Sequence, residues 1–328
     1  MIQIPFNEEI AASAALSMVL EAASYPKPGN VHRLQDFKDT SFEHFLASAL
    51  SVQSVFMKSA AGSGDSDLPA FGPLFYEAVL KSMSLQSGGN THFGTLILLL
   101  PLTIAAGHVF ETAGNESCSP KEIGNAVVLK ASEICRTTTV EDAVCFYETF
   151  GTLSIPVQKP EKGMKDYELD LTESAAIEKI KLEEIPLFDL MALGSRRDMV
   201  AAEWVNGFEK SKKFAKKLQK NKAWFEENPK KCFKSTINSA VVYTFLEFLA
   251  KYPDTFIAAK HGEAESLRVQ KKAAKLMKKL KKSKNLKKMI PKIQKFDQKL
   301  QKEKNNPGSL ADITAAGIFI AILEGLTI

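Results

Sequence analysis

The 328-residue sequence has little of what membrane-spanning or disulfide-stabilised proteins need. Its longest apolar run, Leu96 to Ala106, contains Pro101 and is shorter than the roughly 20 residues that cross a bilayer. No charged and apolar leader segment opens the chain. The four cysteines form no CxxC pair and have no histidine at zinc-site spacing, so we expect reduced, structural thiols. These absences predict a cytoplasmic protein without a membrane contact.

Alternation of apolar and polar residues, the pattern of a β-strand, is also scarce, and no βαβ rhythm or internal repeat is present. Apolar residues instead recur at helical spacing, as at Ile10, Ala14 and Met18. With 45% hydrophobic residues, the chain is long enough to bury a full core. The predicted fold is all-α, a multi-helix globular bundle that forms a single catalytic domain over residues 1–328, with a candidate subdomain boundary near 154–166.

Apolar periodicity and capping residues predict where the helices lie. A proline at the first helical position supports the helix that Ser119 caps. The predicted helices are Glu8 to Ala23, Phe42 to Met57, an apolar helix capped by Thr91 that includes Leu96 to Ala106, a helix from Pro120, Thr172 to Leu182, Leu187 to Leu218, Thr236 to Leu249, Ala264 to Leu300, and a helix capped by Ser309 that ends at Leu323.

The net charge of +5 is unevenly distributed. Residues 271–304 contain fifteen lysines against two acidic residues, a net charge of +13, which leaves −8 for the rest. Leu276, Leu280 and Leu300 recur there at roughly helical spacing, so this Lys-rich segment is predicted to be an amphipathic helix, or a helix pair broken near Pro291. Its lysines form either a solvated surface or a surface that attracts polyanions such as the phosphates of coenzyme A.

A nucleic acid is a less favoured partner for the Lys-rich segment. The segment contains no arginine and, among aromatic residues, only Phe296, so recognition of bases by stacking has little support. An all-α nucleic-acid-binding protein is nevertheless the alternative from a different functional class, and it would bind RNA or DNA without consuming ATP.

Four polar segments interrupt the predicted helices. They are SYPKPGNVHRLQDFKDT (Ser24 to Thr40), GGNTHFG (Gly88 to Gly94), YPDTFIAAKHG (Tyr252 to Gly262) and NNPGSLADITAAG (Asn305 to Gly317). One such segment is usually a solvated loop. Four of them in one all-α chain indicate that the segments converge, and helix starts and glycine-rich turns suit a bound anion. No GxxxxGK[ST] or GxGxxG motif is present, so loops and helix ends would have to hold any nucleotide.

These blocks resemble, in order, those of the triphosphoribosyl-dephospho-CoA synthase family, with similarity from Glu21 to Ala321. The resemblance implies an all-α pentosyltransferase that moves the triphosphoribosyl group of ATP to the ribose 2′-hydroxyl of 3′-dephospho-CoA and releases adenine. The family makes the precursor of the prosthetic group of citrate lyase and malonate decarboxylase. The chain departs from the family pattern at His32, at Phe93 and in Gly194 to Trp204, where the Arg-Gly-Glu-Ala block is not recognisable. It therefore resembles a divergent, stand-alone branch whose acceptor is open.

The resemblance, together with the chemistry of ribosyl transfer, implies roles for individual residues. An oxocarbenium-like transition state needs nearby carboxylates, a base for the hydroxyl and an acid for adenine. Asp39 and Asp312 are the predicted catalytic and Mg²⁺-binding carboxylates, and His92 is the predicted donor to adenine or phosphate. The residues predicted to bind the nucleotide are Lys27, Gly29, Arg33, Gly89, Asn90, Thr91 and Asp254.

Mg²⁺ is the expected cofactor and ATP the co-substrate, because hard oxygen ligands suit a magnesium triphosphate. A different nucleotide donor or acceptor, or hydrolysis of an N-glycosidic bond, remains an alternative on the same fold. A homo-oligomer also remains open.

Overall fold

The computed structural model describes residues 5–61, 68–113, 119–153, 174–283 and 285–328. Within these ranges no strand occurs, and His32 and Gln35 form an isolated bridge. The prediction of an all-α fold is confirmed. The predicted subdomain boundary near 154–166 lies outside the described residues.

The first half of the chain contributes seven helices to the described structure. They are α1 (Phe6–Ala23), α2 (Phe42–Ser51), α3 (Gln53–Ser59), α4 (Phe71–Ser84), α5 (Phe93–Ala113), α6 (Pro120–Arg136) and α7 (Val140–Leu153). The second half continues with α8 (Ser174–Leu182), α9 (Leu187–Gly194), α10 (Met199–Val205), α11 (Glu209–Glu227), η1 (Pro229–Lys231), α12 (Thr236–Leu249), α13 (Thr255–His261), α14 (Glu263–Lys282), η2 (Lys287–Met289), α15 (Ile290–Lys302) and α16 (Gly308–Leu323).

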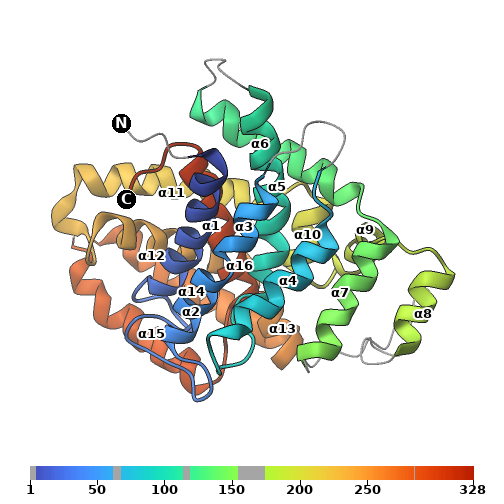
Figure 1. Ribbon diagram of the computed structural model, residues 1–328. Coiled ribbons are helices and arrows are strands. Elements are labelled where there is room, and N and C mark those ends of the chain that lie inside the picture. The colour runs from blue at the N-terminus through green and yellow to red at the C-terminus, as the bar shows by residue number, and fades with distance from the viewer. Residues whose placement is uncertain (1–4, 62–67, 114–118, 154–173, 284) are drawn as a thin grey trace.

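Helices α5 and α16 form the centre of the fold (Figure 1). Both are apolar around their whole circumference, as expected for helices that neighbours cover on every side. By length and composition α5 could cross a membrane, but 78% of its apolar window is buried inside the protein. Helix α16 packs against α1, α5 and α11. The two helices therefore belong to the core of the fold, and both begin at polar segments predicted to form the site.

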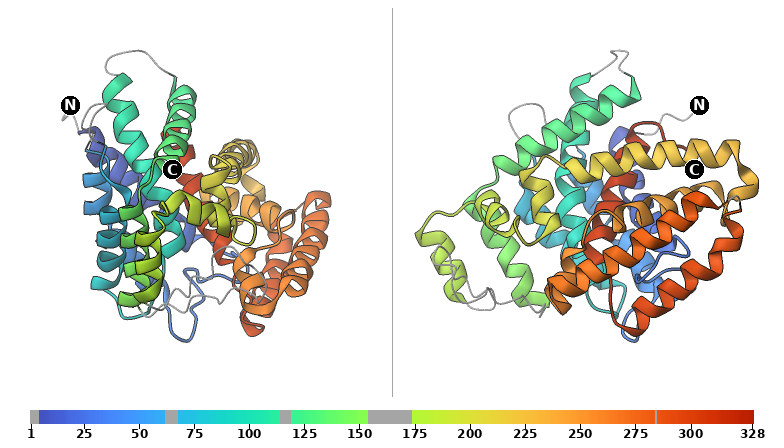
Figure 2. Two further views of the ribbon diagram at one scale, coloured as in Figure 1. Left: turned by 90° about the vertical axis from the view of Figure 1, so that its right-hand side faces the viewer. Right: turned by 180° about the vertical axis from the view of Figure 1, so that it is seen from behind.

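The other helices surround this centre on two sides. Figure 2 shows α1 to α7 on one side and the orange lysine-rich helices on the other, with the loop that follows α1 between them at the lower end. One contiguous hydrophobic cluster joins both sides and includes residues from Ile10 to Leu326. The Trp204 indole, fully buried in it, donates to the carbonyl oxygen of Ile97 at 3.0 Å. The loop after α1 is therefore held where the two sides meet.

Several helices that the sequence predicts as continuous are interrupted in the structure. The helix predicted from Phe42 to Met57 is broken at Val52, which separates α2 from α3. The helix predicted from Leu187 to Leu218 is wrong as a single element, because the chain forms α9, α10 and α11 there. Gly207 and Phe208 both adopt left-handed backbone conformations, with φ of 64° and 57°, which end α10 and turn the chain into α11.

Two predicted helix caps are also wrong. At the start of α5 the amide of Phe93 donates to Oδ1 of Asn90 at 3.0 Å, so Asn90 takes the capping role predicted for Thr91. At the start of α16 the capping position is Pro307, and Ser309 lies inside the first turn. The hydroxyl of Ser309 instead lies 3.0 Å from that of Thr255. The predicted cap at Ser119 is confirmed, since its hydroxyl accepts from the amide of Glu122.

The Lys-rich segment forms two helices, α14 and α15. Helix α14 ends at Lys282, and Pro291 lies in the first turn of α15. A backbone N–H at that position has no partner inside the helix, so its absence in proline costs no helical hydrogen bond. Most large apolar residues of both helices face inward, and Ile293 and Leu300 are fully buried. The lysines therefore stand on the outer face of a structured helix pair.

Candidate active site

The four polar segments meet in the structure. Asn30 donates from Nδ2 to Oδ1 of Asn306 at 2.7 Å, which joins the first segment to the fourth. The Thr40 hydroxyl donates to the carbonyl oxygen of Gly88 at 2.8 Å, which joins the first to the second. The amide of Leu310 donates to Oδ2 of Asp254 at 2.8 Å, which joins the third to the fourth. The convergence predicted from the sequence is thus present in the fold.

Lys27 lies at the centre of this convergence, and 1% of it is exposed. Its Nζ donates to the carbonyl oxygen of Glu21 at 2.7 Å and forms an ion pair with the Glu21 carboxylate. Burial lowers the pKa of Lys27 and raises the pKa of Glu21, and their mutual attraction opposes both shifts. An ammonium group has three N–H donors. Two are engaged by Glu21, so one remains for a ligand.

Asp312 lies one turn inside α16, beside the start of α5. Its Oδ1 accepts from the hydroxyl of Thr95 at 2.6 Å. The carboxylate also lies so close to Gly94 that a side chain at that position would overlap it. Burial, and then the negative charges of Glu21, Asp198 and Asp254, raise the pKa of Asp312 well above its ordinary value. This carboxyl group therefore holds a proton readily and would be stabilised by a cation or by hydroxyl donors of a ligand.

His92 occupies the last position before α5 and is almost fully buried. Its Nδ1 lies 2.9 Å from the hydroxyl of Ser48, and its ring meets Phe45 edge to face at 5.0 Å. The Nε2 atom is buried and has no hydrogen-bond partner in the part of the chain that the structure describes. Burial, followed by the nearby charge of Lys27, lowers the pKa of His92 to about 3, so the imidazole is neutral at physiological pH.

Asp254 is buried, and both of its carboxylate oxygens accept hydrogen bonds from backbone amides. Its Oδ1 accepts from the amide of Ile257 at 3.0 Å, which caps α13, while Oδ2 accepts from the amide of Leu310 in α16. Burial raises its pKa to about 7, although these amides act in the opposite direction. The carboxylate thereby ties the third segment to the fourth.

Gly29 and Arg33 likewise hold the first segment in place. Gly29 has a φ of 85°, and a Cβ there would lie 2.5 Å from the carbonyl oxygen of Asn305, so the position requires glycine. The Arg33 guanidinium donates to the carbonyl oxygen of Ala23 and, at 3.2 Å, to Oδ1 of Asn238. Both residues therefore shape the loop that presents Lys27.

Asp297 of α15 explains why His32 fits where the family pattern has an aspartate. Its Oδ1 accepts from the amide of Gly29 at 2.9 Å, and its Oδ2 lies 2.9 Å from Nε2 of His32. All three residues are buried or nearly so. The Lys-rich segment thus contributes a buried carboxylate that orders the loop of the first segment.

The remaining predicted residues lie at the edge of the site. Gly89 is exposed, with a φ of 75° that permits the turn before α5. Thr91 has a buried hydroxyl oxygen without a partner. Asp39 is exposed on its loop, and its Oδ1 lies 3.4 Å from the hydroxyl of its neighbour Thr40. Of the two predicted carboxylates, Asp312 is therefore in the buried centre and Asp39 is on the surface.

Several residues of the centre were not predicted from the sequence. Asp198 caps α10 through the amide of Val200 at 2.8 Å. It is open to solvent on one side, but protein atoms surround the rest of it, so lost hydration raises its pKa. An aspartate directly before an apolar helix is a capping signal that could have found it. The other three residues, Glu21, Ser48 and Thr95, lie inside helices and carry no comparable local signal.

The described residues contain no group of three or more histidine, cysteine, aspartate or glutamate side chains placed to hold a metal ion. A resident metal centre built by those residues alone therefore does not fit. Mg²⁺ that arrives on a triphosphate needs one or two carboxylates in addition to phosphate oxygens. The half-buried Asp312 carboxylate, with excess negative charge around it, fits that smaller requirement.

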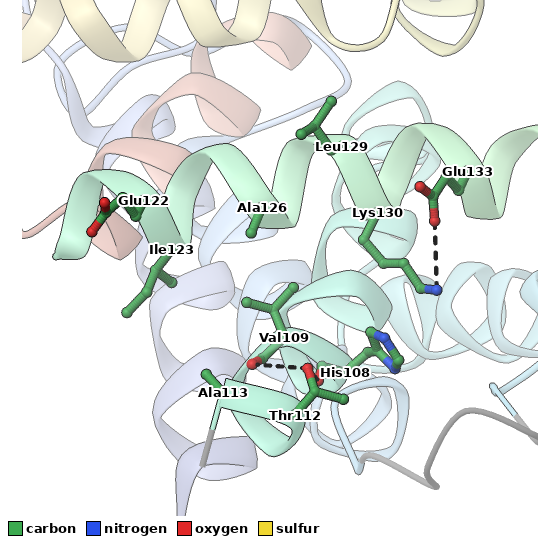
Figure 3. Close-up of a pocket in the computed structure, with 10 residues that line it drawn as sticks. All are labelled: His108, Val109, Thr112, Ala113, Glu122, Ile123, Ala126, Leu129, Lys130 and Glu133. Atoms are coloured by element: carbon green, nitrogen blue, oxygen red, sulfur yellow. Dashed lines mark hydrogen bonds and ion pairs between the residues drawn. The ribbon is translucent and has the colours of Figure 1, made fainter. Parts of the chain in front are cut away.

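Two open grooves on the surface lie away from this centre. Figure 3 shows one of them, with a volume of about 520 Å³, between the end of α5 and α6. Lys130 and Glu133 at its edge form an ion pair at 3.5 Å. The second, of about 560 Å³, lies against α1 and the adjacent α2 and α3. Neither is lined by a residue of the four polar segments, so neither belongs to the site.

The fold and the centre together define an all-α enzyme. Its buried carboxylates, lysine and neutral imidazole stand where four helix breaks meet, and such groups can transfer protons and stabilise developing charge.

Comparison with known proteins gives the family. The model of the family described as ATP:dephospho-CoA triphosphoribosyl transferase matches residues 7–327. Among solved structures, the chain is similar to a protein from Archaeoglobus fulgidus that is provisionally assigned as a triphosphoribosyl-dephospho-CoA synthase. The two share 26% identity with a TM-score of 0.58, over 85% of this chain and 99% of that one. No curated protein matches the chain at a significant level.

Because the family model covers nearly the whole sequence, this chain belongs to the ATP:dephospho-CoA triphosphoribosyl transferase family. It is a transferase, and its family moves a triphosphoribosyl group from ATP to dephospho-CoA. The resemblance recognised from the sequence blocks is thereby confirmed. The family assignment favours the transferase over the nucleic-acid-binding alternative.

Proposed function

We propose that the four segments bind ATP with the anomeric carbon of its ribose facing Asp312, and that dephospho-CoA presents its ribose 2′-hydroxyl to that carbon. The observation that carries this proposal is the position of the Asp312 carboxyl group. It is held by Thr95 and surrounded by further negative charge at the point where the segments meet. No other predicted catalytic carboxylate occupies such a place, since Asp39 is exposed.

The chemistry of the transfer fits these groups. The bond between the anomeric carbon and adenine breaks with its electron pair on adenine, and a bond to the 2′-oxygen forms. Positive charge develops on the ribose in between, and a nearby carboxylate stabilises it. The hydroxyl proton passes to the Asp312 carboxylate, whose raised pKa makes it a suitable acceptor. Departing adenine takes up one proton, which in the overall balance is the one that the 2′-hydroxyl gave to Asp312.

The phosphates require positive charge and N–H donors. The remaining N–H of Lys27 and the exposed amides around Gly89 supply donors on one side of the centre. The side-chain oxygen of Asn90 caps α5, which leaves its Nδ2 group to donate to phosphate. Arg33, Gly29 and Asp254 support the nucleotide indirectly, by fixing the loops that carry these donors.

Mg²⁺ belongs to the same proposal as a companion of the triphosphate. Asp312 is the half-buried carboxylate that would approach it, and Asp39 would reach it from the rim when the loop after α1 contacts a ligand. When bound, the ion neutralises phosphate charge and orients the triphosphate. The cytoplasmic location and the absence of a membrane contact are part of the proposal as well, since α5 is used as a core helix.

Mass spectrometry tests the proposed reaction. The protein is incubated with Mg²⁺, ATP and dephospho-CoA, and we expect free adenine together with dephospho-CoA enlarged by a triphosphoribosyl group. A dephospho-CoA analogue that lacks the 2′-hydroxyl of its adenosine ribose is the matched control and should give no conjugate. Adenine without a conjugate would point to another acceptor or to hydrolysis. Neither product would overturn the choice of substrates.

A further inference from the structure

His92 is fixed at one ring nitrogen and left open at the other. Its Nδ1 lies 2.9 Å from the Ser48 hydroxyl, and the ring packs against Phe45. The Nε2 atom is buried without a partner among the described residues, and 3% of the side chain is exposed. A buried polar atom without a partner destabilises a protein, so such an atom in a site calls for a ligand.

The Ser48 hydroxyl determines which nitrogen carries the proton. Other helical serines here donate to their own helix, as Ser51 does to the carbonyl oxygen of Ala47 at 2.7 Å and Ser82 to that of Val79 at 2.7 Å. Ser48 is fully buried in α2, and its hydroxyl is directed to His92 instead. The hydroxyl proton is satisfied if Nδ1 accepts it. A neutral imidazole then carries its own hydrogen on Nε2.

We infer that Ser48 is a positioning residue that holds His92 as the neutral tautomer protonated at Nε2, and that this N–H donates a hydrogen bond to an acceptor atom of bound ATP. The inference rests on the proposed function for the identity of the ligand. The tautomer itself follows from the contacts of the protein alone.

The surroundings of Nε2 match an acceptor that carries negative charge. Lys27 is close enough to disfavour a positive charge on His92, and one of its N–H groups is unused. The Thr91 hydroxyl oxygen is also buried without a partner. A phosphate oxygen and a ring nitrogen of departing adenine are both acceptors of this kind. Either would receive a hydrogen bond from a donor that does not add a second full charge beside Lys27.

Nitrogen-15 NMR of the imidazole tests the tautomer directly. In the ligand-free wild-type protein we expect His92 to show a protonated Nε2 and an unprotonated Nδ1, without titration between pH 6 and pH 8. In Ser48→Ala the preference should weaken, and the spectrum should show both tautomers. A wild-type signal from the tautomer protonated at Nδ1 would overturn the inference.

Ligand addition identifies the acceptor. The Nε2 resonance should shift with ATP, and the arms with tripolyphosphate alone and with adenine alone show whether phosphate or base receives the bond. A resonance unchanged by all three would overturn the second half of the inference. Failure of the proposed function looks different, because the wild type would then release no adenine while the tautomer stayed as inferred.

Kinetics of Ser48→Ala test the consequence for the reaction. Loss of a residue that orients a site imidazole through a hydrogen bond should lower kcat/KM for ATP by about tenfold to a hundredfold. Ser48→Thr, which keeps the hydroxyl, should recover part of it. Ser82→Ala is the matched control, since it removes a buried helical hydroxyl with no link to His92, and its kcat/KM should match that of the wild type. Equal losses in Ser48→Ala and Ser82→Ala would show a merely structural role and contradict the inference.

Discussion

Glu21, Lys27 and Asp312 lie in the middle of the fold, whereas thirteen lysines of the Lys-rich segment stand exposed on its surface. In the centre each charged group contacts a named partner, and burial shifts the pKa values of all three. On the surface, within the described part of the chain, Lys281 forms an ion pair with Glu247 and Lys299 forms one with Glu303. The few central charges are therefore suited to chemistry, and the many outer ones contribute a general positive field.

Removing the Asp312 carboxylate should have the largest effect on activity and the opposite effect on stability. Asp312→Asn is expected to lower kcat by about a thousandfold, because the base and a stabilising charge are lost. The folded-state pKa is raised, so the ionised carboxylate weakens the fold at neutral pH, and the variant should unfold at the same temperature or higher. Quenched-flow measurement of adenine and thermal unfolding by circular dichroism check the two effects. Asp189→Asn, on the exposed start of α9, is the control.

A lower unfolding temperature together with normal turnover would contradict the assignment of Asp312. Asp198, whose charge acts on Asp312, would then be the candidate for the catalytic base.

Breaking the buried ion pair should produce the largest loss of stability. Lys27→Met leaves Glu21 buried without its partner and is expected to reduce the unfolding free energy by about 3 kcal/mol. The double variant with Glu21→Gln should recover a large part of that loss but no activity. The surface ion pair of Lys58 with Glu77, at 2.7 Å, is the control for a second double-mutant cycle. There we expect an interaction energy between the two side chains below about 1 kcal/mol. Urea unfolding of all variants gives the interaction energy of each pair. Equal interaction energies for the buried and the surface pair would refute the prediction.

The pH dependence of stability should report Asp254. Its pKa in the folded protein is about 7, above the ordinary value of 3.8, so unfolding between those values releases a proton. Rising pH therefore favours unfolding in this range. We expect the stability of the wild type relative to Asp254→Asn to fall by about 1.4 kcal/mol per pH unit, from about pH 4 to about pH 7, and then to level off. Denaturant titrations at several pH values check it, and a difference that rises with pH would have the wrong sign.

Neutralising outer lysines should have the smallest effect. The triple variant of Lys288, Lys292 and Lys295 to glutamine is expected to change the unfolding free energy by less than about 0.5 kcal/mol, because these side chains are exposed. Its kcat should stay within about twofold of the wild type, while kcat/KM for ATP falls at low salt and converges at high salt. Steady-state assays across ionic strength measure this. A large loss of kcat would show that these lysines take part in the site. It would contradict the distinction between central and outer charged groups.

Local chemistry predicted much of the fold. Thr236 to Leu249 was predicted with the bounds that the structure shows, and in the structure Ser235 caps this apolar helix. The break after α1 was predicted because Pro26 and Pro28 remove backbone donors. The turn at Phe208 was not predicted, since a phenylalanine gives no local signal of a left-handed backbone, and tertiary packing imposes it.

The site was predicted by segment better than by side chain. Helix-breaking residues mark where the chain leaves a helix, which is a local property, and all four segments converge. Which side chain of a segment faces inward depends on contacts far away in sequence. Asp39 is exposed at the rim and Asp312 is half-buried in the centre for that reason, and Gly29 is required by its contact with the carbonyl oxygen of Asn305. The role of Ser48 depends on its contact with His92, which only the structure shows.

Hydrogen exchange with and without magnesium ATP tests whether the four polar segments form one nucleotide site. We expect ATP to slow amide exchange together in 24–40, 88–95, 252–262 and 305–312, in the wild type and in the triple lysine variant alike. Protection confined to the outer faces of α14 and α15, with the four segments unchanged, would contradict it.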